Sequence, residues 1–290
     1  MKKINLVYWN EPNFGDALSP QIIEELSVCK TKLKAAYINS FRKFIKGLLF
    51  LSWREIRMIL FPWQPNILGV GSVITCGNSR SKVWGSGFMS DTDSFKGGDI
   101  FAVRGPLTAQ RLIKQGFPKC EIYGDPALLL PLWIKPAIEK KYKLGIVPHW
   151  KEVDKFNECY GSEYKVIDLR TKKIEKILEE ITSCEYILST SLHGLIVPHA
   201  YNIPALWIKD GYIETDGFKF LDYFASVNIP EYGGFTNVKD ILADESNWMR
   251  LFNNNKDKSL INEPIDPLQK RLIRVAPFPL KKKYETFVNM

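Results

Sequence analysis

The sequence lacks the features that mark several common classes of protein. No Cys-x-x-Cys pair occurs in its 290 residues, and the five cysteines stand singly, which argues against a structural zinc site and favours a reducing compartment. No stretch approaches 18 uninterrupted apolar residues, so no transmembrane helix is expected. The apolar run within residues 1–9 is too short for a signal peptide, and we interpret it as a first buried strand.

A dinucleotide-binding fingerprint is also incomplete. Gly69-Val-Gly71 follows an apolar run, but the third glycine of Gly-x-Gly-x-x-Gly is missing and no acidic residue follows at the usual distance. Histidine is scarce, with three in the chain, so each one can be considered individually as a candidate acid or base.

Positive charge is concentrated in one segment. The formal net charge is +8, and residues 30–60 alone carry a net +7. Residues 41–61 have apolar side chains at helical spacing and basic side chains mostly off that stripe, which predicts a basic amphipathic helix. Two interpretations remain open, a helix packed on its own domain or one lying on an anionic membrane surface together with Lys281–Lys283. Nucleic-acid binding is not indicated, because the charge does not spread along a groove between aromatic residues.

The order of apolar runs and amphipathic segments predicts an α/β protein. Strands alternate with helices along the chain, which favours two Rossmann-like, doubly wound domains that face each other across a cleft. We expect an N-terminal domain over residues 1–140, a C-terminal domain over 141–265 and a basic tail over 266–290. A Pro-, Glu- and Lys-containing stretch at 134–141 is the expected linker.

The stretch 185–207 is the centre of this prediction. A short apolar strand ends in Ser189-Thr190-Ser191, and Leu192-His193-Gly194 then opens a second apolar run, which is typical of a strand, a tight turn and a helix. Such a turn is where ligands bind in parallel sheets, and a helix N-terminus suits an anion. The alternative is an ordinary helix cap followed by a buried histidine.

Further candidate residues stand at predicted strand ends in the first half. Arg104 follows one strand and could clamp an anion bidentately, or form a structural ion pair with a neighbouring loop. Asn13 and Asp16 border a glycine after the first strand, where a plain turn with an Asp cap is the alternative. Facing domains would place Arg104 and Asp16 opposite His149 and His193.

Five motifs in order resemble the polysaccharide pyruvyl transferase family, over roughly residues 1–225. They are Asn-Phe-Gly-Asp-Ala-Leu-Ser-Pro (13–20), Val-Trp-Gly-Ser-Gly-Phe (83–88), Ala-Val-Arg-Gly-Pro-Leu-Thr (102–108), Gly-Asp-Pro-Ala-Leu-Leu-Leu-Pro (124–131) and Ser-Leu-His-Gly-Leu-Ile (191–196). The resemblance implies a GT-B-like fold and transfer of the pyruvyl group of phosphoenolpyruvate onto two hydroxyls of a sugar. The product would be a cyclic ketal on a capsular, exopolysaccharide or other surface glycan, with phosphate released.

The resemblance also implies roles for individual residues. His193 would be the general acid and Arg104 a catalytic, donor-binding cation. The donor side would comprise Arg104, Ser191, Leu192, His193, Gly194, Lys209 and Lys219, and the acceptor side Asn13, Asp16, Gly85, Ser86, Asp125 and His149. Phosphoenolpyruvate would be a co-substrate, and the chemistry requires neither a metal nor a nucleotide cofactor.

One position departs from the family pattern. Many members have Arg directly before Leu-His, where this chain has Ser191. Lys209 or Lys219 could replace that charge, Ser191 and the amides of residues 192–194 could suffice, or the donor could differ. The alternative function is a GT-B-type glycosyltransferase that uses a nucleotide sugar. For either enzyme we expect a cytoplasmic location, with a peripheral contact at the inner face of the membrane if residues 41–61 bind lipid and the acceptor is lipid-linked.

Overall fold

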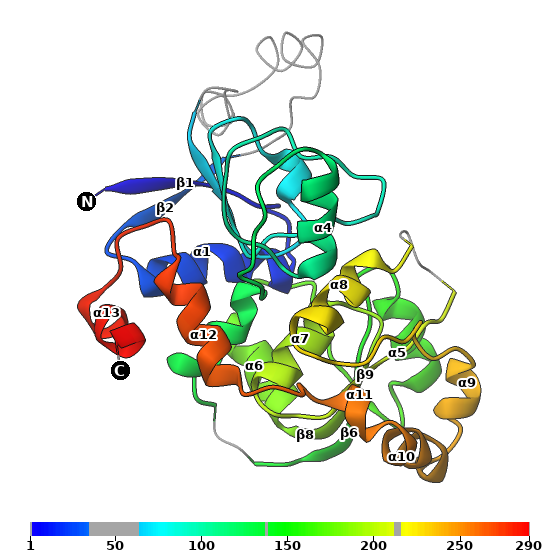
Figure 1. Cartoon of the computed structure of the whole chain (residues 1–290). Helices are drawn as coiled ribbons and strands as arrows, with labels where there is room; N and C mark the ends of the chain where they lie inside the picture. The colour runs from blue at the N-terminus through cyan, green and yellow to red at the C-terminus, as the bar shows by residue number, and fades with distance from the viewer. Residues whose placement is uncertain (1, 35–63, 137–138, 212–215, 290) are drawn as a thin grey trace, which may run out of the picture.

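Parallel strands and helices alternate along the chain (Figure 1). The computed structural model describes residues 2–34, 64–136, 139–211 and 216–289. The predicted basic helix at 41–61 therefore lies outside the described residues. The elements are β1 (Lys3–Val7), α1 (Phe14–Leu26), β2 (Lys30–Lys34), β3 (Asn66–Leu68), η1 (Ile74–Cys76), β4 (Ser81–Trp84), β5 (Asp99–Ala102), α4 (Pro106–Lys114), η2 (Pro126–Leu132), β6 (Tyr142–Val147), α5 (Val153–Tyr160), β7 (Lys165–Val166), α6 (Ile174–Thr182), β8 (Cys184–Ser189), α7 (His193–Ala200), β9 (Ala205–Trp207), α8 (Phe218–Ser226), α9 (Val238–Ile241), α10 (Glu245–Asn254), α11 (Lys256–Ser259), α12 (Ile265–Arg274) and α13 (Lys282–Asn289).

The first half of the chain forms one parallel sheet. Within the described ranges its strand order is β2-β1-β3-β4-β5, and every neighbouring pair is parallel. β3 is buried at all three positions, as expected of a strand covered on both faces by helices and loops. The amphipathic α1 buries Leu18, Ile22 and Leu26 beneath this sheet.

The second half forms a separate parallel sheet of order β7-β6-β8-β9 in the part of the chain that the structure describes. β8 lies between β6 and β9, and its Ile187 and Leu188 have no exposed surface. Both sheets are parallel and carry crossover helices, so the predicted α/β class is confirmed. β8 leads directly into α7, so the strand–turn–helix predicted at 185–207 is present.

The two halves share a hydrophobic core. One continuous cluster of buried side chains contains Leu6 and Phe14 from the first half, Val147 and Leu195 from the second, and Leu272 from the C-terminal segment. Helix α1 and the 3-10 helix η2 contact α6 and α7 at this junction. The site described below is built where these four elements meet.

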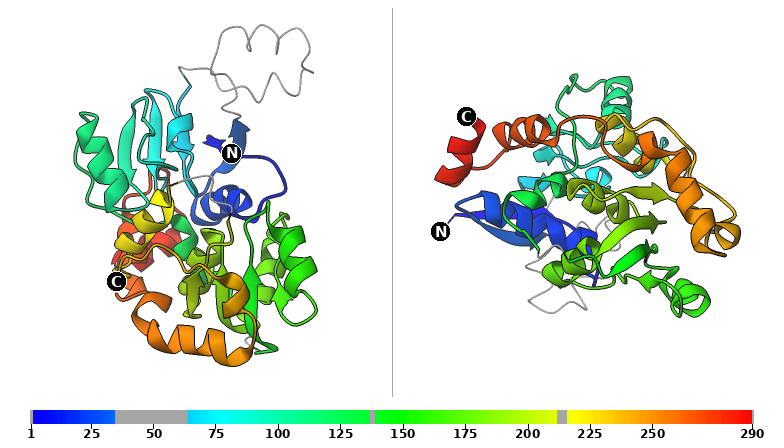
Figure 2. Two further views of the ribbon diagram at one scale, coloured as in Figure 1. Left: turned by 90° about the vertical axis from the view of Figure 1, so that its right-hand side faces the viewer. Right: turned by 90° about the horizontal axis from the view of Figure 1, so that it is seen from below.

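The C-terminal segment packs on the first half rather than extending as a tail. α12 and α13 lie beside α1 in Figures 1 and 2. The backbone N–H of Lys281 donates to Leu26 O, and Trp84 Nε1 donates to Leu272 O at 2.9 Å. The apolar face of α12, with Leu268 and Leu272 fully buried, explains why this basic segment nevertheless folds back onto the protein.

The apolar start of Ile122–Ala127 predicts a strand, but the structure shows a single bridge there, between Val103 and Tyr123. The chain turns away there because Gly124 has a φ of +139° and Asp125-Pro126 begins η2. Proline has no N–H to donate to a sheet, and it suits the first position of a helix.

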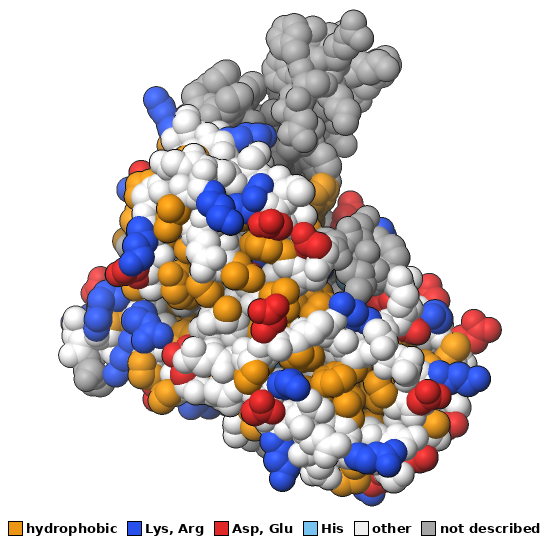
Figure 3. All heavy atoms as spheres, turned by 45° about the vertical axis from the view of Figure 1, so that its right-hand side comes forward, with side chains coloured by type: hydrophobic (Ala, Val, Ile, Leu, Met, Phe, Trp, Pro, Cys, Tyr) orange, Lys and Arg blue, Asp and Glu red, His pale blue; other side chains and the backbone are white. Residues whose placement is uncertain are grey.

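The described surface carries charges of both signs. On the face shown in Figure 3, Lys and Arg side chains are interspersed with Asp and Glu and with apolar patches. Among the described residues, no helix is both long and apolar enough to cross a lipid bilayer.

Candidate active site

His193 and Asp125 face each other at the junction of the two halves. Nε2 of His193, the first residue of α7, lies 3.9 Å from Oδ2 of Asp125, the cap residue of η2. Neither of these two buried atoms has a hydrogen-bond partner among the described residues. The other oxygen of Asp125 accepts the N–H of Ala127 at 2.9 Å, which fixes the carboxyl group. Packing holds the imidazole and the carboxyl group slightly too far apart to form a hydrogen bond with each other. The space between them can hold a proton that takes part in a reaction.

Burial shifts both groups toward their neutral forms. It raises the pKa of Asp125, whose side chain has no exposed surface, and the charge of His193 opposes this shift. Burial also lowers the pKa of His193, whose side chain is 14% exposed, while Asp125 raises it and Lys219 and Arg104 lower it further. Perturbed groups that face each other are typical of functional sites.

The N-terminus of α1 packs against the His193 ring. A Cβ atom placed on Gly15 would come within 2.2 Å of His193 Nδ1, so only glycine permits this approach. Asn13 caps the helix, accepting the N–H of Asp16 on Oδ1 at 3.4 Å. The structure therefore brings the predicted Asn-Phe-Gly-Asp and Ser-Leu-His motifs together, and the cap is Asn13 rather than Asp16.

Asp16 occupies the first turn of α1 with its carboxyl group mostly buried. Burial raises its pKa to about 6, and a hydrogen bond from the backbone N–H of Trp9 partly opposes the shift. A carboxyl group with that pKa changes protonation close to neutral pH, as an acid or base on an acceptor hydroxyl must.

The hydroxyls between β8 and α7 hold the turn in place. Ser189 Oγ lies 2.7 Å from Val147 O and 2.9 Å from Ser191 O, and it accepts the N–H of Ser191. Thr190 Oγ1 accepts the N–H of His149 at 2.6 Å and donates to Glu152. A Cβ on Gly194 would come within 2.2 Å of Ser189 Oγ, so this glycine allows α7 to start directly above the strand end. The buried Leu192 precedes α7, and no side chain caps this helix.

Arg104 is fully buried and engaged by other protein groups. Its Nε donates to Asp222 Oδ2 at 3.0 Å, and its two terminal nitrogens donate to Ser72 Oγ and Phe88 O. Asp222, on α8, also accepts the N–H and the hydroxyl of Thr108 at the start of α4. An internal carboxylate thus occupies the anion position that Arg104 and the α4 N-terminus offer. This is the structural ion pair that the sequence left open, and donor contact by Arg104 stays a prediction.

The Gly85-Ser86-Gly87 turn packs against both the Asp125 segment and the Arg104 guanidinium. Gly85 has a φ of +87°, and a Cβ there would lie 2.3 Å from Pro126, next to Asp125. A Cβ on Gly87 would lie 2.6 Å from the Arg104 guanidinium carbon. Ser86 Oγ donates to Gly71 O and accepts the N–H of Val73, so its hydroxyl closes the turn rather than facing open space. The predicted acceptor role of Gly85 and Ser86 remains untested.

The remaining predicted cations differ in their relation to His193. The charge of Lys219, in the first turn of α8, lowers the pKa of His193, which places it within electrostatic reach of the site. Lys209 Nζ lies over the Trp207 ring, 4.5 Å from its centroid. Many family members have an arginine where this chain has Ser191. Lys219 is therefore better placed than Lys209 to supply that positive charge.

Some residues of the site were missed in the sequence, and some have structural roles. Asp222 was missed, although a lone carboxylate within the aromatic α8 sequence Phe-Lys-Phe-Leu-Asp-Tyr-Phe is a usable signal. His199, the other histidine of the central stretch, is buried between Tyr223 Oη and Ala205 O, and burial lowers its pKa to about 4. It therefore belongs to the core. Within the described residues, no group of three or more His, Cys, Asp or Glu side chains could hold a metal ion.

The fold and this site define an α/β protein in which a histidine at the start of α7 faces the carboxyl group that caps η2. Comparison with known proteins then gives the family. Residues 83–211, which include Arg104, Asp125 and His193, match the family model for polysaccharide pyruvyl transferases.

Two curated proteins are similar to the chain. An uncharacterized protein of Acanthamoeba polyphaga mimivirus is 29% identical over 235 residues, which cover 73% of this chain and 81% of that protein. The succinoglycan biosynthesis protein ExoV of Rhizobium meliloti is 27% identical over 176 residues, covering 56% of this chain and 54% of that protein. No solved structure matches.

Proposed function

We propose that the protein transfers the pyruvyl group of phosphoenolpyruvate onto a sugar of a surface polysaccharide or its lipid-linked precursor. The observation that carries this proposal is the buried His193–Asp125 pair, which lies inside the segment matched by the pyruvyl transferase family. The similarity to a succinoglycan biosynthesis protein supports a polysaccharide-related acceptor. A pyruvyl transfer needs an acid that protonates carbon, and a histidine kept close to a carboxyl group suits that task.

The reaction proceeds in two additions. His193 gives its proton to the methylene carbon of phosphoenolpyruvate while a sugar hydroxyl forms a bond to C2. The C2–O bond to phosphate then breaks, and a second hydroxyl of the same sugar closes the ketal. The two hydroxyl protons balance the one gained by the methyl group and the one carried away by phosphate. Asp125 faces Nε2 of His193 and stabilises the protonated ring from which the proton is given.

The anionic donor needs positive charge near His193. We assign this role to Lys219 and to the uncapped N-terminal amides of α7, next to Ser191 and Leu192. Arg104 contributes through its field, since its charge lowers the pKa of both Asp125 and His193. Asp16, beside Asn13, is the residue we assign to the acceptor hydroxyls. The chemistry requires no metal or nucleotide cofactor, and we expect turnover to survive a chelator.

We also propose how the two halves of the chain are arranged around His193. Two parallel sheets joined at α1, η2, α6 and α7 support a GT-B-like pair of domains divided near residue 140. A cleft between them would open beside His193. A cytoplasmic enzyme that binds the inner face of the membrane through residues 41–61 would meet a lipid-linked acceptor there.

The test is a phosphate-release assay with phosphoenolpyruvate and a panel of nucleotide- and lipid-linked sugars. Wild-type protein should release phosphate only when an acceptor is present, and His193→Ala should lower turnover by a factor of about 100 or more. Circular dichroism of the variant controls for folding. Nucleotide release from a nucleotide sugar, without use of phosphoenolpyruvate, would instead identify a glycosyltransferase. Near-wild-type turnover in a folded His193→Ala variant would show that His193 is not the catalytic acid.

A further inference from the structure

A pocket separate from the His193–Asp125 pair lies in the second half of the chain, between residues that follow β9 and helices α9 and α10. Its volume is ≈ 360 Å³, within the usual range for small-molecule sites. Its lining shares no residue with the site described above. Figures 1 and 2 show α10 on the side of the second half that is turned away from the first sheet.

Hydrogen bonds between the walls preform this pocket. The backbone N–H of Phe235 donates to Trp207 O at 2.9 Å, so the first wall continues the edge of the second sheet. The Asn247 side chain joins the two helices, because its Nδ2 donates to Asp240 O at 2.9 Å and its Oδ1 accepts from Arg250 at 2.7 Å. A ligand therefore meets groups that are already held in place, which lowers the entropic cost of binding.

Two opposite charges line the pocket without pairing with each other. Asp240 and Arg250 are the two charged residues of the lining, so the lining carries no net charge. Within the described residues neither side chain takes part in an ion pair, and the Asp240 carboxylate accepts no hydrogen bond. The Arg250 guanidinium donates to Asn247 alone and has further N–H groups. A strong acceptor and a strong donor are therefore available to a ligand in the same pocket.

Amide and hydroxyl side chains line the rest of the polar wall. Asn237 precedes α9, but its side chain does not cap the helix, and the Asn254 amide forms no hydrogen bond within the described part of the chain. Thr236 adds a hydroxyl. An amide both donates and accepts, a carboxylate only accepts and a guanidinium only donates. This mixture suits a ligand with several hydroxyl groups, because each hydroxyl can donate to one neighbour and accept from another.

An apolar wall completes the pocket. Phe235, Ile241 and Leu251 line it, and all three are only partly buried by the protein. A sugar ring has apolar C–H faces and carries its hydroxyl groups around the edge. An aromatic and aliphatic surface beside a few convergent polar groups is therefore suited to such a ring.

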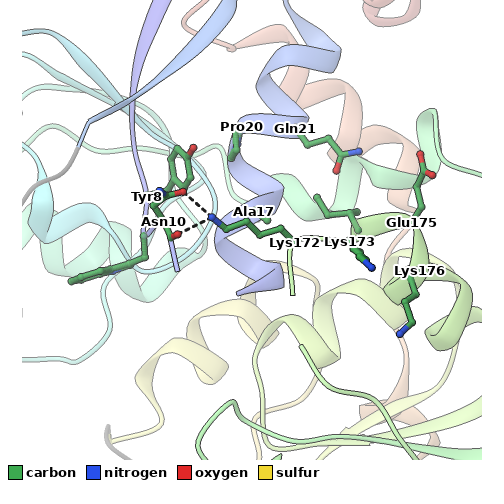
Figure 4. Close-up of a pocket in the computed structure, with 11 residues that line it drawn as sticks. Tyr8, Asn10, Ala17, Pro20, Gln21, Lys172, Lys173, Glu175 and Lys176 are labelled. Atoms are coloured by element: carbon green, nitrogen blue, oxygen red, sulfur yellow. Dashed lines mark hydrogen bonds between the residues drawn. The ribbon is translucent and has the colours of Figure 1, made fainter. Parts of the chain in front are cut away.

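A groove elsewhere in the molecule provides a contrast in charge. It lies between α1 and the start of α6, and three lysines and one glutamate give its lining a net charge of +2 (Figure 4). The dashed lines in Figure 4 show Lys172 donating to neutral oxygens of Asn10, so these contacts do not neutralise its charge. That groove favours anions, whereas the pocket at α9 and α10 has no excess charge and favours a neutral ligand.

We infer that the pocket between α9 and α10 binds a neutral sugar unit, as a saccharide site separate from the reacting groups. The inference goes beyond the proposed function, because the pocket shares no residue with the His193–Asp125 pair and binds the sugar whichever group is transferred. In an enzyme that modifies a polysaccharide, such a site holds one unit of the glycan while another unit reacts.

An NMR titration of protein labelled with ¹⁵N-asparagine tests the inference without any turnover. The side-chain amide signals of Asn237 and Asn254 report on the pocket, and replacing each residue by Ala assigns them. The probes are methyl β-D-glucopyranoside, methyl β-D-galactopyranoside and methyl α-D-mannopyranoside, with glucuronate as the charged control. We expect at least one neutral glycoside to shift both signals until they saturate, and glucuronate to bind no more tightly than that glycoside.

A single substitution removes the acceptor-only group of the pocket. Asp240→Ala should weaken glycoside binding at least about 10-fold, because a hydrogen bond to a charged group is lost. The Asp240 side chain makes no hydrogen bond among the described residues, so the fold does not depend on it. Lys239→Ala is the matched control, one position earlier in α9 and outside the lining, and it should bind the glycoside as wild type does.

The remaining outcomes decide whether the sugar occupies this pocket. Equal affinity in Asp240→Ala and wild type overturns the inference, as does tighter binding of glucuronate than of every neutral glycoside. Shifts confined to other asparagines, such as Asn13 beside His193, or no shift with any of the three glycosides, also overturn it. Because the titration needs no catalysis, failure of pyruvyl transfer in the phosphate-release assay is a separate result.

Discussion

The Arg104 guanidinium and the Asp222 carboxylate form an ion pair with no exposed surface, with Nε and Oδ2 3.0 Å apart. The pair joins α8 to the β5–α4 turn, and Asp222 also caps α4 through the Thr108 N–H at 2.8 Å. A Cβ on Gly105 would overlap the Asp222 backbone oxygen, so the two segments are in close contact. Since Lys219 lies on the same helix, this pair also positions a cation whose charge lowers the pKa of His193.

Removal of the Asp222 charge should destabilise the protein strongly. Asp222→Asn leaves the Arg104 charge buried without its partner, and we expect the free energy of unfolding to fall by about 3 kcal/mol or more. Asp154→Asn breaks the Arg170 pair, in which Asp154 is 84% exposed, and should change the free energy of unfolding far less because solvent screens this pair. Urea unfolding of both variants makes the comparison. Equal urea midpoints for Asp222→Asn and Asp154→Asn would show that the buried Arg104 pair contributes no more to stability than the exposed one.

Asp125→Asn should move the pH dependence of turnover. His193 acts as an acid, so the rate falls as the pH rises through its pKa. The Asp125 carboxylate raises that pKa, and its loss should shift the alkaline limb of kcat to lower pH. The profile is measured by phosphate release between pH 5 and 9. An unchanged limb would mean that Asp125 does not act on the catalytic proton.

Asp16 should make the free energy of unfolding depend on pH between its pKa in the unfolded protein and its pKa in the folded protein. Its pKa is about 6 in the folded protein against an ordinary value of 3.8, so the folded state holds the proton more tightly. The stabilisation is present below about pH 4 and is lost as the pH rises through 6, up to about 3 kcal/mol. Asp16→Asn should therefore unfold at higher urea than wild type at pH 7.5 and at a similar urea concentration at pH 4. A variant that is less stable at both pH values would show that the ionised carboxylate is favourable there.

Vesicle co-sedimentation tests the basic segment at 41–61, which lies outside the described residues. Each basic residue near an anionic surface contributes about 1 kcal/mol, so binding should require anionic lipid and decline at high salt. Replacing Lys43, Lys46, Arg54 and Arg57 by Gln should abolish it. Absence of binding by the wild type to anionic vesicles at low salt would indicate a helix packed on the protein.

Local patterns predicted much of the fold. The sequence pattern predicts a helix at 218–226 and strands at 144–147, 164–169 and 186–188. The helix is α8 with those bounds, and the runs at 144–147 and 186–188 lie within β6 and β8. These segments have clear periodicity or continuous burial, which short-range sequence reveals. The strand expected at 164–169 shrinks to two residues in β7, because tertiary pairing and not propensity decides where an edge strand ends.

The site was predictable at the level of strand ends but not of contacts. Parallel strands put Asp125 and His193 at ligand-binding edges, yet only the docking of η2 on α7 sets the two side chains 3.9 Å apart. Arg104 illustrates why a local sequence pattern does not reveal the contacts of a residue. Its pattern fits an anion clamp equally well whether the anion is a ligand or Asp222, which is 118 residues away and comes from a helix whose docking no local pattern specifies.

The return of α12 to the first sheet has a consequence for synthesis on the ribosome. Trp84 donates to Leu272 O, Gln269 donates to Leu128 O, and Leu268 and Leu272 complete the core around Gly124. The first half is translated long before these partners exist, so its apolar surface stays uncovered until residues 265–274 emerge. A nascent chain stalled after residue 260 should therefore remain sensitive to protease throughout its first half, and the N-terminal half reaches its native state only after residues 265–274 have been synthesised.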